Sequence, residues 1–165
     1  MQPARLIPVA ALLLLSSLAR ADEPAAAKTA VPLDQAALEK GFAETMSGAV
    51  MEGSFTVTGE ADDKSPKTEK YTLGKVKKLK GDFWLFETRV QYGEKDVVVP
   101  MQLEVKWAGD TPVITLTDLM IPGLGTFTAR VVVYRDHYAG FWSGTDHGGH
   151  LFGRITKGDK PEAKP

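Results

Sequence analysis

Residues 125–156 of this chain read GTFTARVVVYRDHYAGFWSGTDHGGHLFGRIT. The stretch predicts three short β-strands in succession, over residues 125–134, 137–143 and 149–156. A turn at Arg135 and Asp136 joins the first two strands, and a glycine-rich loop joins the second to the third. Strands joined by such short turns pair with their neighbours in antiparallel order, so this stretch indicates an all-β fold.

Five further strand-like segments precede this stretch, over residues 50–59, 68–80, 82–92, 96–107 and 113–119. The segment 96–107 alternates most clearly between apolar and polar residues. Its apolar residues share one face: Val97, Val99, Met101, Leu103, Val105 and Trp107. Such alternation is typical of an antiparallel sheet with one buried face and one wet face. Pro100 lacks a backbone donor and predicts a local edge, bulge or corner.

One short helix precedes the strands. Asp34 is a good N-cap because its carboxylate can accept hydrogen bonds from the first free amides of a helix. Over residues 35–46, three apolar residues recur at every fourth position: Leu38, Phe42 and Met46. This spacing places them on one helical face, which needs an apolar surface to pack on.

Eight strands after one helix predict an eight-stranded antiparallel up-and-down β-barrel. Closure removes the exposed edges and leaves an interior wide enough for side chains or one small ligand. A two-sheet β-sandwich is the alternative. The barrel is favoured because nearly every strand is joined to the next by a short hairpin.

The N-terminus carries the features of a secretory signal peptide over residues 1–21. Arg5 precedes the apolar run 6–18, and Ala19-Arg20-Ala21 forms a small-x-small cleavage site. We expect a flexible linker over residues 22–33, the helix and barrel over 34–156, and a disordered tail over 157–165. An exported protein without cysteine suits the bacterial periplasm or extracellular space, with no membrane span after cleavage.

The charge balance argues against a nucleic-acid partner. Cleavage after Ala21 removes two arginines and no acidic residue, which leaves 18 basic and 21 acidic residues. A chain of this net charge is not suited to nucleic acid or to an anionic membrane surface.

Local sequences at both ends of the predicted barrel carry a family resemblance. They are residues 51–55 (MEGSF), residues 138–142 (YAGFW), the glycine pair at 148–149, and residues 153–155 (GRI). On these features, residues 47–156 resemble small secreted bacterial β-barrel proteins of the lipocalin-like (calycin-like) type. The resemblance implies a closed barrel in an exported protein, and it implies no particular ligand.

Aromatic residues and one arginine form the candidate ligand site. These are Trp84, Phe86, Trp107, Phe127, Arg130, Tyr138 and Trp142. The aromatic side chains either pack the barrel or line a pocket for an apolar molecule. Arg130 shares a face with Thr128 and Val132. It is a solvated outer charge or, if that face lines the barrel, a buried cation able to bind a carboxylate.

The histidines give a candidate site for a divalent metal ion. His147 and His150 lie three residues apart beside Asp146, and His137 adds a fourth ligand if its strand end lies next to this loop. The alternative is a hairpin turn that needs positive φ at Gly148 and Gly149. No organic cofactor is predicted.

Three functions follow from these patterns. The first is a non-enzymatic binding protein for a small, largely apolar molecule, which predicts a continuous internal cavity. The second is a structural or interaction protein of the cell envelope, with a filled core and an exposed apolar patch at residues 120–124. The third is a metal-dependent enzyme that uses the histidine loop. The sequence leaves the oligomeric state open.

Overall fold

The computed structural model describes residues 34–58 and 65–158. The predicted signal peptide, the linker and residues 159–165 of the predicted tail lie outside these residues. Lys157, assigned to the tail from sequence, is the last residue of a strand. No helix in the described part of the chain is both long enough and apolar enough to cross a membrane.

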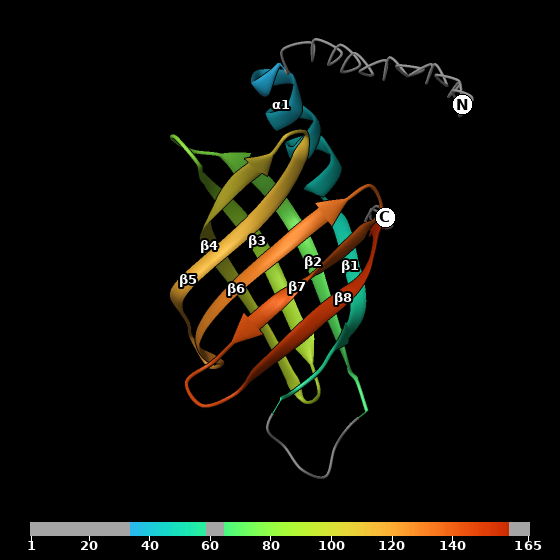
Figure 1. Ribbon diagram of the computed structural model, residues 1–165, viewed down its shortest axis with the longest axis vertical. Coiled ribbons are helices and arrows are strands. Elements are labelled where there is room, and N and C mark those ends of the chain that lie inside the picture. Colours follow the sequence, from blue (N-terminus) through green and yellow to red (C-terminus); the bar gives the residue numbers. More distant parts are fainter. Residues whose placement is uncertain (1–33, 59–64, 159–165) are drawn as a thin grey trace, which may run out of the picture. The chain divides into compact units, whose positions relative to one another are not determined.

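Helix α1 (Gln35–Met46) has the predicted bounds and lies at one end of the barrel (Figure 1). The Asp34 carboxylate accepts hydrogen bonds from the amides of Ala36 and Ala37, at 3.1 and 3.2 Å, which confirms the N-cap. Phe42 and Met46 are buried. The helix therefore packs on the barrel through the face that the apolar spacing predicts.

Eight antiparallel strands follow and close into a barrel (Figure 1). They are β1 (Ala49–Phe55), β2 (Lys67–Lys78), β3 (Phe83–Tyr92), β4 (Lys95–Ala108), β5 (Thr111–Ile121), β6 (Gly125–Tyr134), β7 (His137–Ser143) and β8 (Gly148–Lys157). Each strand pairs with the next, and β8 pairs with β1. The up-and-down barrel is confirmed, and the two-sheet sandwich is wrong.

Several strand boundaries differ from the sequence prediction, by one to four residues. Strand β1 ends at Phe55, after which Thr58 makes only an isolated bridge to Gly148. Strand β5 continues to Ile121 and includes Met120, which the sequence assigned to an apolar connection. The longer strand is possible because β5 and β6 pair again beyond a bulge between Leu116 and Leu119.

Large side chains fill the barrel below the helix. The Phe42 ring lies 5.1 Å from the Trp84 ring and 6.0 Å from the Trp107 ring, both edge-on. Trp84 and Phe86 are almost completely buried. Aromatic packing of this kind buries a large apolar area per residue, so α1 closes this end of the core.

Pro100 lies where β4 has a partner on one side only. It pairs with Glu87 of β3, whereas the register between β4 and β5 runs only from Glu104 to Ala108. Because β5 does not pair with β4 at this position, the absence of an amide proton on Pro100 removes no hydrogen bond between these two strands. The expectation of a local edge at this position is confirmed.

Candidate functional site

The predicted aromatic ligand residues divide into separate groups. Trp84, Phe86 and Trp107 surround Phe42 at the helix end. Trp142 instead contacts the rings of Phe55 and Phe127, at 5.8 and 6.3 Å. Both groups pack the core, so they do not converge on one binding pocket.

Tyr138 belongs to a buried polar cluster that the sequence analysis missed. Its hydroxyl donates to Glu69 Oε1 at 2.9 Å, and the Tyr71 hydroxyl donates to Glu69 Oε2 at 2.7 Å. Glu69 is only 6% exposed. Glu69 lies two residues before Tyr71 and four before Leu73, so the three share one strand face. This spacing was the signal in the sequence that Glu69 points into the barrel.

Burial dominates the electrostatics of this cluster. It raises the pKa of the Glu69 carboxyl above its ordinary value, and the hydrogen bonds from Tyr71 and Tyr138 lower that pKa in part. Burial and the nearby Glu69 charge raise the pKa of both phenols. Tyr71 and Tyr138 therefore remain protonated and can both donate hydrogen bonds to the buried Glu69 carboxyl.

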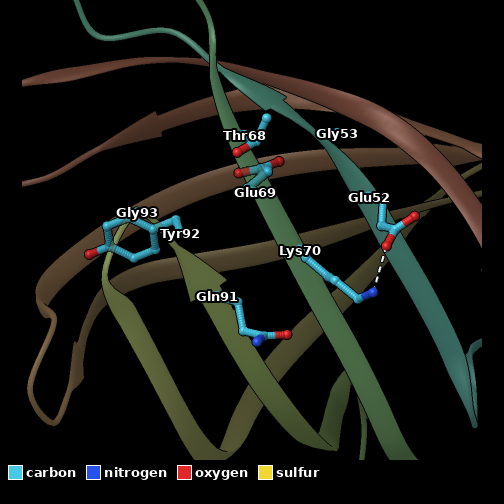
Figure 2. Close-up of a pocket in the computed structure, with 8 residues that line it drawn as sticks. All are labelled: Glu52, Gly53, Thr68, Glu69, Lys70, Gln91, Tyr92 and Gly93. Atoms are coloured by element: carbon cyan, nitrogen blue, oxygen red, sulfur yellow. Dashed lines mark ion pairs between the residues drawn. The ribbon is translucent and has the colours of Figure 1, made fainter.

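A surface hollow, the rim hollow, lies beside Glu69. It has a volume of about 400 Å³ and is lined by the residues labelled in Figure 2. Figure 2 shows Lys70 pointing toward Glu52, with Lys70 Nζ 2.6 Å from Glu52 Oε1. The charges of Lys70 and Glu52 therefore neutralise each other on the outer side of the rim hollow.

The predicted metal ligands point to different partners. His147 Nδ1 lies 2.5 Å from Asp146 Oδ1, whereas His150 Nδ1 lies 3.2 Å from Thr56 Oγ1. His137 lies at the opposite end of β7 from this loop. Within residues 34–58 and 65–158, no three His, Cys, Asp or Glu side chains are placed to hold a metal ion.

The alternative prediction of a glycine turn is also wrong. Gly148 and Gly149 belong to β8, and neither has a positive φ. A Cβ on Gly149 would lie 1.8 Å from the Thr56 carbonyl oxygen. Glycine is needed here for close backbone approach rather than for turn geometry.

A second depression, the outer hollow, lies on the outside of β6, β7 and β8. Phe141, Phe152 and Val132 bound it, and they are 64%, 48% and 42% exposed. Its volume is about 690 Å³. Cross-strand pairing places Ala139 between Val132 and Phe152, and its small methyl group leaves room between the larger side chains.

Arg130 lines the outer hollow and points away from the barrel interior. The alternative in which Arg130 lines the interior is therefore wrong. Arg130 pairs in register with Phe141, and Phe141 pairs with His150 on the next strand. The Phe141 and His150 rings lie 5.1 Å apart.

The outward position of Phe141 and Phe152 follows from strand alternation. Phe141 neighbours the inward Trp142, and Phe152 lies between the buried Leu151 and the half-buried Gly153. A period of two could have identified each residue as an outer one. Their grouping with Arg130 depends on the strand register.

Comparison with known proteins adds no further guide. No family model matches this chain, and no curated protein or solved structure matches it significantly. The functional conclusion therefore rests on the fold and on the geometry of the described side chains.

Proposed function

We propose that this protein is a non-catalytic binding protein that holds a small, largely apolar molecule in the outer hollow. The observation that carries this proposal is the group of exposed apolar side chains around the outer hollow, which has a volume of about 690 Å³. That volume falls in the usual range of small-molecule sites, roughly 300–1,000 Å³. Covering apolar surface contributes about 25 cal/mol per Å².

The proposed site replaces the internal cavity expected from the sequence. Trp84, Phe86 and Phe42 occupy the interior at the helix end and contact one another. Phe141 and Phe152 form apolar walls of the outer hollow, although the sequence did not identify them as ligand-binding residues. Of the residues that it did select for ligand binding, Arg130 lines the outer hollow.

An interaction protein of the cell envelope is the second candidate function. The filled core fits it, and so does Met120, which lies in the predicted patch and is 66% exposed. Ile121, the next residue of that patch, is buried. This candidate predicts that Phe141 or Met120 lies in a protein interface, which chemical cross-linking in the host envelope would detect.

Export and the lipocalin-like type are part of the same proposal. The signal-peptide features of residues 1–21 support export, and the closed eight-stranded barrel supports the lipocalin-like resemblance. Cleavage after Ala21 gives a mature chain that begins at Asp22. The intact mass of the protein from the periplasmic or culture fraction tests this, and a chain that retains residues 1–21 contradicts it.

Fluorescence titration with N-phenylnaphthylamine, an uncharged apolar dye, tests binding in the outer hollow. We expect dye emission to rise on binding and Phe141→Ala to weaken affinity about tenfold, because a buried Phe contributes roughly 1.5–3 kcal/mol. Phe83→Ala removes a partly exposed ring from β3 and is the matched control. Absence of dye binding, or equal losses in both variants, contradicts the proposal.

A further inference from the structure

Three hydrogen bonds hold the guanidinium of Arg130 in place, and they use only some of its N–H groups. Its Nη1 donates to the carbonyl of Leu116 and, at 2.7 Å, to that of Ala129. Its Nη2 donates to Thr117 Oγ1 at 3.0 Å. A guanidinium has five N–H donors, so these contacts leave Nε–H and one Nη2–H for another acceptor.

The bulge in β5 explains these contacts. It interrupts the pairing between β5 and β6 after Leu116, and Arg130 reaches the Leu116 carbonyl from the neighbouring strand. Asp118 in the same bulge is directed elsewhere. Its amide donates to Thr128 Oγ1 at 3.0 Å, and that hydroxyl donates to Asp118 Oδ1 at 3.1 Å.

The charge of Arg130 therefore has no carboxylate partner among the described residues, since no acidic oxygen lies within ion-pair distance. Two of the other three described arginines are paired with a carboxylate, whereas Arg135 lies over the Tyr134 ring. Arg89 contacts Asp96, and Arg154 contacts Asp136. Arg130 differs from Arg89 and Arg154 because it has no carboxylate partner and its side chain lines the outer hollow.

We propose that the occupant of the outer hollow is an apolar organic acid, with its carboxylate on Arg130 and its apolar body between Phe141 and Phe152. This inference rests on the proposed function and adds the ligand class. The two free N–H donors match the two oxygens of a carboxylate. A phosphate ester has more oxygen acceptors and charge than this single cation satisfies, so the carboxylate is the better match.

His150 also lines the outer hollow, and one of its ring nitrogens is already engaged. Its Nδ1 is engaged with Thr56 Oγ1, and its ring lies against Phe141. The lining of the outer hollow thus includes Arg130 on β6, and the Phe141 and His150 rings on β7 and β8. A ligand with one terminal acid and a long apolar body fits this division.

Displacement of bound N-phenylnaphthylamine by decanoate and by decanol tests the ligand class. The two probes share a hydrocarbon chain and differ in the acid group, which is ionised well above a pKa of about 4–5. We expect decanoate to displace the dye at about tenfold lower concentration, as charge-assisted hydrogen bonds imply. Added salt should reduce this preference.

Substitution of Arg130 assigns the preference to its side chain. We expect Arg130→Gln to remove the advantage of decanoate while the affinity for decanol stays the same. Arg89→Gln, which removes an outward arginine from β3, is the matched control and should keep the advantage. An equal loss for both probes in Arg130→Gln would show a structural role alone and would overturn the inference.

The wild-type protein gives a decisive result even if Arg130→Gln does not fold. If decanoate displaces the dye no better than decanol, the acid inference is wrong, although dye binding still supports the proposed function. If the dye does not bind, both proposals fail. Sedimentation of the ligand-free protein adds one outcome: a dimer that Phe141→Ala dissociates and decanoate leaves intact overturns the inference.

Discussion

The Tyr138 hydroxyl of β7 donates a hydrogen bond to Glu69 of β2 over 2.9 Å, although 69 positions separate the two residues in the chain. The strand register explains this contact. Tyr138 pairs with Gly153, Gly153 with Gly53, and Gly53 with Glu69. The tyrosine ring crosses the two glycines, where no side chains obstruct it, and so reaches the carboxyl.

Removal of this hydroxyl should destabilise the barrel. In Tyr138→Phe, Glu69 Oε1 loses its donor in a buried position, which typically costs about 1–3 kcal/mol. Urea denaturation measures the loss. Tyr134→Phe, an exposed tyrosine on the neighbouring strand, is the control and should change stability by less than about 0.5 kcal/mol. Equal stability of the two variants would contradict the role of the hydrogen bond.

Glu69 should give stability an unusual pH dependence. Its pKa is raised in the folded protein, so the folded state retains the proton at a pH where the unfolded state has lost it. The contribution of Glu69 is therefore fully present below the unfolded pKa, about 4.3, and declines as the pH rises through the folded value. Glu69→Gln should remove this decline.

The measurement for this prediction is the stability difference between wild type and Glu69→Gln as a function of pH. A difference is needed because Asp82, Asp96, Asp136 and Asp146 have lowered pKa values and lose stabilising interactions as the pH falls. These groups are common to both proteins. A difference that stays constant from about pH 4 upward would contradict the raised pKa.

Two glycine-to-alanine substitutions should have opposite effects. A Cβ on Gly53 would lie 2.6 Å from the Tyr138 hydroxyl and 2.1 Å from the Phe152 carbonyl oxygen. Gly53→Ala should therefore cost about 3 kcal/mol or more, at the upper end of overpacking effects. Gly41 of α1 has open space around it, so Gly41→Ala should stabilise by up to about 1 kcal/mol. Thermal denaturation of both variants tests the pair, and a loss of similar size in both would be evidence against the crowding argument.

Phe42 should be a main contributor to the helix-end core. Phe42→Ala removes the ring that contacts Trp84, Phe86 and Trp107, and such truncations cost about 3–5 kcal/mol. The Trp emission maximum should also shift to the red as water reaches Trp84. Phe83→Ala, with its partly exposed ring, should cost much less. An unchanged emission spectrum in Phe42→Ala would show that α1 does not seal this end.

Local patterns in the sequence were sufficient for the strands and the helix. Alternation over Val97 to Trp107 predicts a half-buried strand because successive side chains point to opposite faces. Asp34 and the spacing of Phe42 and Met46 give the helix, whose bounds are confirmed. Short hairpins favoured the barrel over the sandwich, and the pairing of β8 with β1 confirmed it.

The candidate site was only partly predictable, because side chains on different strands meet through register and barrel stagger. Arg130 was selected from sequence, but its neighbours Phe141 and Phe152 were not. The histidines were a candidate metal site from sequence, with His137 included only if its strand end lay beside the loop, but His137 and His147 lie at opposite ends of β7. Sequence spacing gives no information on which strand ends share a side of the barrel.

The sequence by itself determined the order of the elements and which residues of a strand share a face, since both depend on local periodicity and on turn length. The tertiary structure alone decided that Glu69 meets Tyr138, and that Arg130 lies beside Phe141 with no carboxylate partner among the described residues. These contacts join distant segments of the chain. They arise from closure of the barrel, which fixes the register of all eight strands together.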